Sequence, residues 1–163
     1  SRLEPLGVKL VQVWGNDIPP FADGYFDLVT NRHGSFLAQE LQRILKPGGI
    51  FITQQVGGKN NFWLNQLLQE KPEFIYSHWT LNLAVKQLTD AGFQILEQKD
   101  EYPETTVSDI GALVFHLKVI QWQITDFSVE KYYDKLVEIY NMIQEQGCLK
   151  IRSHRFLIMA KKI

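Results

Sequence analysis

Apolar residues along the chain follow two patterns that alternate, continuous runs and helical spacing. Mostly apolar runs rich in β-branched or aromatic residues predict buried strands, whereas apolar positions spaced three to four residues apart predict amphipathic helices. The predicted strands cover residues 8–14, 25–30, 50–56, 93–97 and 156–160. The predicted helices cover residues 35–45, 61–70, 80–90, 110–120 and 129–146.

Polar and turn-forming residues mark where these elements begin and end. Ser35 offers a hydroxyl that predicts the N-cap of the first helix. Lys46, Pro47, Gly48 and Gly49 follow that helix, and proline and glycine predict its end.

Strands that alternate with helices predict an α/β fold with a largely parallel sheet covered by helices on both faces. Ligands of such sheets bind beyond the carboxyl ends of the strands. In this chain those ends are residues 15–17, 31–33 and 54–57. The pattern therefore predicts where a ligand binds without naming the ligand.

Composition narrows the class of protein. The chain has 163 residues, of which 45% are hydrophobic, which is enough for one compact domain. A net charge of -1 gives no reason to expect a nucleic acid or an anionic membrane as a partner. Cys148 is the single cysteine, which excludes a disulfide framework. The lack of disulfides fits a reducing compartment, so we expect a cytoplasmic protein. The apolar runs of the chain are too short to span a bilayer.

The sequence shows no motif for a metal site, a serine nucleophile or a phosphate-binding loop. His33, His78, His116 and His154 are scattered and show no metal-ligand spacing, so we expect no metal site. The sequence holds neither a GxSxG serine elbow nor a GxxxxGK[ST] phosphate loop.

Three motifs in order resemble one known family. They are PFADGYFDLVT at 20–30, LKPGG at 45–49 and LTDAGF at 88–93, each next to a predicted strand, and the strand at 155–161 completes the pattern. This arrangement resembles the class I S-adenosylmethionine-dependent methyltransferases. The resemblance implies a Rossmann-like methyltransferase sheet, truncated at the N-terminus, within a single partial domain at 1–163. Residues 101–152 look like a helical insertion before a final antiparallel strand.

The sequence departs from the family in the elements that bind the cofactor. The family's first strand ends in a glycine-rich turn and its second in an acidic residue that binds the ribose, and neither element is present. Residues 8–14 would then be the third strand, and the strand at 25–30 would have a bare edge. Three resolutions stay open. The two strands pair directly, two copies form a homodimer through the exposed sheet edge, or the missing segment comes from elsewhere.

The resemblance also implies roles for individual residues. It places Asn16, Asp17 and Ile18 beside the adenine of S-adenosylmethionine, although the first two equally suit an Asx turn before proline. Asn31 and Arg32 would lie beside the methionine part of the cofactor.

His33 would take a proton from the acceptor as the catalytic base, or it is simply a hydrogen-bonding surface histidine. Of Gln54 and Gln55, alternation points one toward the acceptor, unless both are structural. Asp27, at the opposite end of its strand, is interpreted as structural. Aromatic residues of the insertion, such as Trp122, fit packing better than a lid over the site.

The function implied is methyl transfer from S-adenosylmethionine to a small-molecule acceptor. A non-catalytic, methyltransferase-like module acting through self-association or protein contacts is the alternative from another class. A dinucleotide oxidoreductase ranks last, because it needs the same missing glycine loop.

Overall fold

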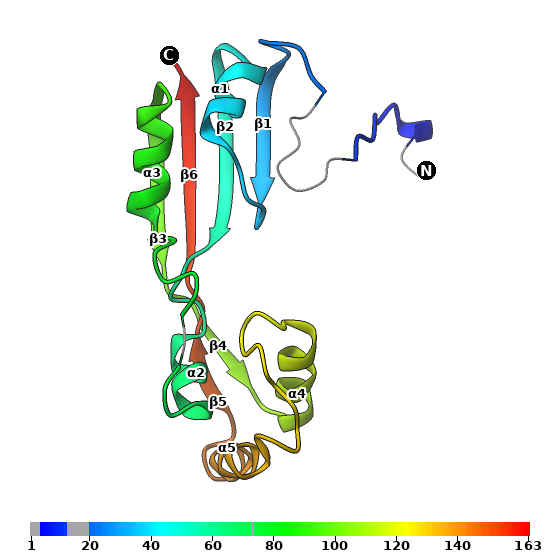
Figure 1. Ribbon diagram of the computed structural model, residues 1–163, viewed down its shortest axis with the longest axis vertical. Helices are drawn as coiled ribbons and strands as arrows, with labels where there is room; N and C mark the ends of the chain where they lie inside the picture. Colours follow the sequence, from blue (N-terminus) through cyan, green and yellow to red (C-terminus); the bar gives the residue numbers. More distant parts are fainter. Residues whose placement is uncertain (1–3, 13–19, 73) are drawn as a thin grey trace.

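The protein is described here by a computed structural model, which describes residues 4–12, 20–72 and 74–163 (Figure 1). Its helices and strands follow the predicted order along most of the chain. In sequence they are η1 (Glu4–Leu6), β1 (Phe26–Arg32), α1 (Ala38–Ile44), β2 (Leu45–Val56), α2 (Phe62–Leu68), α3 (Leu81–Asp90), β3 (Phe93–Glu101), β4 (Glu104–Val107), α4 (Ile110–Val119), α5 (Tyr133–Gln146), β5 (Leu149–Arg152) and β6 (Arg155–Lys162).

The main sheet has four strands in the order β1-β2-β6-β3. β1 runs parallel to β2, while β6 runs antiparallel to both β2 and β3. The predicted final antiparallel strand is therefore confirmed, and it lies inside the sheet rather than at its edge.

The strand predicted at 8–14 is wrong over the residues that the structure describes. Residues 8–12 form no strand and do not pair with β1, and residues 13 and 14 lie outside the described residues. A strand needs a ladder partner to satisfy its backbone groups, and this apolar segment lies apart from the sheet in Figure 1. β1 is thus an edge strand of the described sheet.

The LKPGG segment forms the start of β2, where its glycines are needed for backbone conformation and close packing. Gly48 has a φ of 77°, which favours glycine. A Cβ on Gly49 would lie 2.9 Å from the carbonyl oxygen of Lys46. The Lys46 Nζ also lies 2.7 Å from a carboxylate oxygen of Asp27. The contact supports the structural interpretation of Asp27, and both side chains are exposed.

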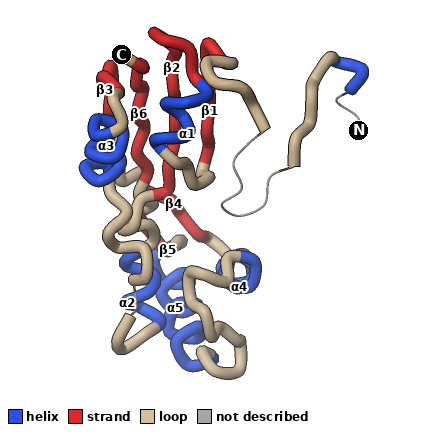
Figure 2. Tube along the Cα trace, turned by 45° about the horizontal axis from the view of Figure 1, so that its top comes forward, coloured by secondary structure: helices blue, strands red, loops and turns tan. Residues whose placement is uncertain are grey.

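Helices cover one face of the sheet, not both as predicted. α1 and α3 lie on the same side in Figures 1 and 2. Their apolar residues form one core with the inward positions of the strands, which are Leu45, Phe51, Phe93, Phe156, Ile158 and Ala160. Alternate positions such as Ile52 and Met159 stay partly exposed, because the described residues supply no helix for that face.

A second core lies beyond the carboxyl ends of β1 and β2. It joins α2, α4 and α5 to a small antiparallel sheet of β4 and β5, through buried residues such as Leu64, Leu117 and Ile139. The region predicted as an insertion at 101–152 holds four of these elements. The pattern missed β4 and β5, since each has only four residues, none of them fully buried in β4 and only two in β5.

The N-cap predicted at Ser35 is wrong. α1 begins at Ala38, with Leu37 at the N-cap and no side-chain cap hydrogen bond. The backbone before the helix is held elsewhere, because Asn31 Nδ2 donates to the carbonyl oxygen of Ser35 and Gln55 Nε2 donates to that of Gly34.

α3 carries a well-formed cap that allows a controlled stability test. The Oγ1 of Thr80 accepts from the backbone N–H of Leu83 at 3.3 Å. We expect Thr80→Ala to lower the free energy of unfolding by about 1 kcal/mol. Thr89→Ala in the same helix is the matched control, because its hydroxyl only bonds back to the carbonyls of Val85 and Lys86. Urea unfolding of both variants measures the difference, and equal losses would contradict the capping role.

Candidate functional site

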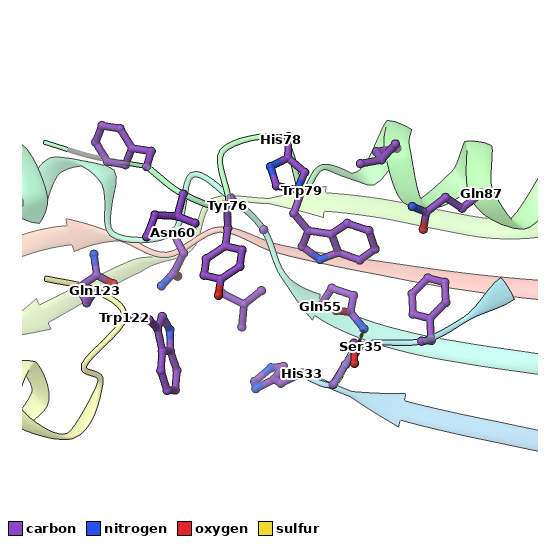
Figure 3. A pocket seen from close by; sticks show the side chains of 18 of the residues that line it. His33, Ser35, Gln55, Asn60, Tyr76, His78, Trp79, Gln87, Trp122 and Gln123 are labelled. Carbon is purple, nitrogen blue, oxygen red and sulfur yellow. Dashed lines mark hydrogen bonds between the residues drawn. The ribbon is translucent and has the colours of Figure 1, made fainter. Parts of the chain in front are cut away.

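A cavity of about 550 Å³ lies at the carboxyl ends of β1 and β2, between the two cores (Figure 3). Its size falls in the range of small-molecule sites. It is lined by His33, Gly34, Ser35, Phe36, Gln55, Val56, Gly57, Gly58, Asn60, Asn65, Phe74, Ile75, Tyr76, His78, Trp79, Leu83, Gln87, Trp122 and Gln123. The cavity therefore occupies the place where the fold predicts a ligand.

His33 stands at the exit of β1 in an unusual backbone conformation. Its φ is 58°, in the left-handed region that few non-glycine residues adopt. Its N–H donates to the carbonyl oxygen of Gln54 at 2.8 Å, which ties the end of β1 to β2. Strain of this kind concentrates at functional sites, and it makes His33 a candidate.

A buried amide network holds the turn that carries His33. The Oδ1 of Asn31 accepts from Thr53 Oγ1 at 3.0 Å and from Gln55 Nε2 at 2.7 Å. The Gln55 amide also donates to the carbonyl oxygen of Gly34 at 3.0 Å. Gln55 thus fixes the loop after β1 from the neighbouring strand, and this side chain positions the histidine.

The surroundings of His33 keep its imidazole neutral. His33 is largely exposed, but desolvation by the part of its ring that is covered, followed by the positive charges of Arg155 and then Arg32, lowers the pKa of His33 below its ordinary value of about 6.5. Each of these effects disfavours the imidazolium. A neutral imidazole at physiological pH has a free lone pair with which to accept a proton.

The pKa of His33 can be measured directly. We expect an NMR titration to give a value below 6.5, and Arg32→Gln to move it upward because one of the neighbouring positive charges is removed. The exposed lysine Lys86 provides the control, since Lys86→Gln removes a positive charge that is not among those acting on His33. A wild-type value above 6.5, or equal shifts in both variants, would contradict this electrostatic account.

Gly57 allows a close contact in the wall of the site. A Cβ there would lie 2.1 Å from the ring of His154, which is 1% exposed. Two hydrogen bonds and one stacking contact hold this ring in place. Its Nδ1 accepts from the backbone N–H of Lys59 at 3.1 Å, so its Nε2 donates to Asp100 Oδ1 at 2.8 Å. Tyr102 stacks on it, with 4.5 Å between ring centroids.

Gly58 is packed as closely against the loop that forms another wall. A Cβ on Gly58 would lie 2.0 Å from the carbonyl oxygen of Tyr76. The Gly58 N–H donates to the carbonyl oxygen of Trp79 at 2.8 Å. The Trp79 ring in turn packs against Phe36 and Phe156, with centroids 5.9 and 5.8 Å away. The glycine pair therefore fixes this loop against the end of β2.

A second amide cluster places Trp122 at the cavity. Asn65 Nδ2 donates to the carbonyl oxygen of Gln123 at 3.0 Å, and the Gln123 amide bonds back to Asn65 Oδ1. Ile124 is buried next to it. Trp122 itself is 63% exposed, so a rigid segment presents its ring to the solvent-facing side of the cavity (Figure 3).

Comparison with known proteins bears on the fold. The chain is similar to the structure of a candidate methyltransferase from Bacillus halodurans C-125, with 19% identity and a TM-score of 0.60 over 99% of this chain and 75% of that one. The chain has the class I methyltransferase fold. The YcgJ protein of Bacillus subtilis matches over the same shares of both chains, with 14% identity and a TM-score of 0.55.

An S-adenosylmethionine-dependent methyltransferase of Methanosarcina mazei also matches, with 18% identity and a TM-score of 0.43, over 88% of this chain and 62% of that one. No protein-family model and no curated protein matches the chain.

Within this methyltransferase fold the residues predicted from the sequence separate into three groups. His33 and Gln55 line the cavity. Asn31 and Arg32 do not line it, since Asn31 is used in the network below His33 and Arg32 is exposed. Gln54 points away from it, on the sheet face opposite to Gln55. Asn16, Asp17 and Ile18 lie outside the described residues.

The sequence-based prediction missed the walls built by two loops. Residues Phe74, Tyr76, His78 and Trp79 come from the loop between α2 and α3, and Trp122 and Gln123 come from the loop after α4. The six residues 74–79 of this loop hold four ring side chains, which is a signal in the sequence for such a wall. Binding residues often lie on loops that a rigid scaffold holds in position.

Among the residues that the structure describes, no three His, Cys, Asp or Glu side chains gather as metal ligands would. No helix in the described part of the chain is long and apolar enough to span a membrane.

Proposed function

We propose that this protein transfers a methyl group from S-adenosylmethionine to a small-molecule acceptor held in the cavity. The observation that carries the proposal is the position of His33. It lies at the carboxyl end of β1 of a methyltransferase fold, in a strained conformation, and lines a cavity of about 550 Å³.

The described residues fit the methyl-donating end of this cofactor. S-adenosylmethionine supplies an electrophilic methyl group on a positively charged sulfur. No Lys or Arg belongs to the described lining, and the charges of Arg155 and Arg32 act on His33 from outside it. The rings of Phe36 and Trp79 offer faces that attract positive charge. His33 at the end of β1 would lie along this end of the cofactor.

The chain's own residues would act on the acceptor. His33 would accept the proton that an acceptor hydroxyl loses as its oxygen attacks the methyl group, and would release that proton to water afterwards. Arg32 and Arg155 keep the imidazole ready for this step by disfavouring its protonated form. Gln55 and the Gly57-Gly58 pair hold the walls in place, and positioning of this kind supplies a large part of the catalysis.

The test is transfer of a labelled methyl group. The chain is incubated with S-adenosylmethionine labelled at the methyl group and a panel of small hydroxylated compounds, and products are separated by chromatography. We expect label in at least one compound, with transfer suppressed by excess S-adenosylhomocysteine. Absence of labelled product across the panel, from a chain shown to be folded, would contradict the proposed activity.

A further inference from the structure

The lining of the cavity is uncharged over the described residues. It contains no Asp, Glu, Lys or Arg, although those residue types make up 21% of the chain. An anionic acceptor would find no cationic side chain in the described lining with which to pair. A cationic acceptor would meet no carboxylate. The walls therefore favour a neutral molecule.

Aromatic side chains from two different loops line the same cavity. Figure 3 shows Tyr76, Trp79 and Trp122 around the cavity, with His33 between the wall of Trp122 and the end of β1. Tyr76 and Trp122 are 57% and 63% exposed, and both line this cavity. Each has one face available to stack on a flat ligand.

Rings of this kind also attract cations, so a quaternary ammonium ligand has to be weighed against a neutral one. Arg155 and Arg32 act on this part of the site, since their positive charges lower the pKa of His33. The S-adenosylmethionine proposed for this site carries its own positive sulfur, which would repel a cationic acceptor beside it. The arginine charges favour an acceptor oxygen that gains negative charge as it loses its proton.

We propose that the acceptor is a flat, uncharged aromatic compound bearing a hydroxyl group, stacked between Trp122 and Tyr76 with its oxygen toward His33. This inference deepens the proposed function and rests on it for the role of His33. The aromatic binding site itself stands on the rings and on the uncharged lining.

Three naphthalene probes of matched size separate the alternatives. They are 2-naphthol, which is neutral, 2-naphthoate, which is an anion, and 2-naphthylmethylammonium, which is a cation. Each is titrated into the 15N-labelled chain while the tryptophan indole N–H signals are followed by NMR. We expect 2-naphthol to shift the signals of Trp79 and Trp122 and to bind at least about tenfold more tightly than either ion.

Two tryptophan variants provide the matched comparison. Trp122→Ala should weaken 2-naphthol binding about tenfold, because one stacking face is lost. Trp63→Ala should leave it unchanged, since Trp63 is equally exposed at 58% but lies on α2 outside this cavity. Circular dichroism checks that both variants are folded.

Each other outcome overturns the inference. Tighter binding of the anion or cation would show that the lining does not select neutral ligands, and shifts confined to Trp63 would place the aromatic site elsewhere. If S-adenosylhomocysteine shifts the His33 amide while 2-naphthol binds nowhere, only the acceptor class is wrong. If 2-naphthol binds and S-adenosylhomocysteine does not, the failure lies with the proposed function.

Discussion

Gly57→Ala is expected to lower the free energy of unfolding by about 3 kcal/mol or more, the upper range for overpacking. The added Cβ would lie 2.1 Å from the His154 ring, far inside contact distance. That ring cannot move aside without giving up its bonds to Asp100 and to the N–H of Lys59. In a chain of this length we expect the melting temperature to fall by roughly 10 °C.

A double-variant cycle shows whether His154 is the cause. His154→Ala alone is destabilising, because it leaves a gap and unpaired partners. Combined with Gly57→Ala it also removes the clash, so the double variant should be more stable than the sum of the single losses predicts, by at least about 1 kcal/mol. Additive losses in urea unfolding would mean that the glycine is needed for another reason.

His33→Asn is expected to reduce methyl transfer about a hundredfold or more, the lower range for loss of a positioned general base. Asparagine tolerates the left-handed conformation at φ 58°, so the fold should keep its stability. The amide cannot take a proton, and the reaction loses its base.

The pH profile distinguishes this role from a structural one. Wild-type transfer should rise with pH through a midpoint below 6.5, because the base is active only when unprotonated and its pKa is lowered. In His33→Asn that rise should disappear. A folded variant that keeps the wild-type acid limb would show that His33 does not act as the base.

The order and type of most elements could be predicted from the sequence, because continuous apolar runs and helical spacing reflect which residues are buried. β1, β2, β3 and β6 and all five helices were found in this way. The prediction of a strand at 8–14 was wrong, although the apolar pattern there is typical of a strand. In the described chain residues 8–12 have no neighbouring strand with which to pair. Periodicity reports burial preference and does not report pairing.

The candidate site could be predicted only where it follows from strand ends. His33 and Gln55 come directly after or at the end of a parallel strand, so the rule for such sheets locates them. Trp122 and Tyr76 reach the cavity through contacts of Gln123 and Gly58 with residues far away in the sequence. The glycine pair itself suggested only a turn, since the atoms that crowd Gly57 belong to His154.

The most direct test of the central claim is an NMR titration of the 15N-labelled chain with S-adenosylhomocysteine up to millimolar concentration. The claim is that the carboxyl ends of β1 and β2 form the reacting end of a methyltransferase site. Adenosine serves as the control, because it lacks the part that would reach these strand ends. We predict shifts of the His33, Gly34, Gln55 and Gly57 amides that adenosine does not reproduce. No shifts at these residues, or the same shifts with adenosine, would contradict the account.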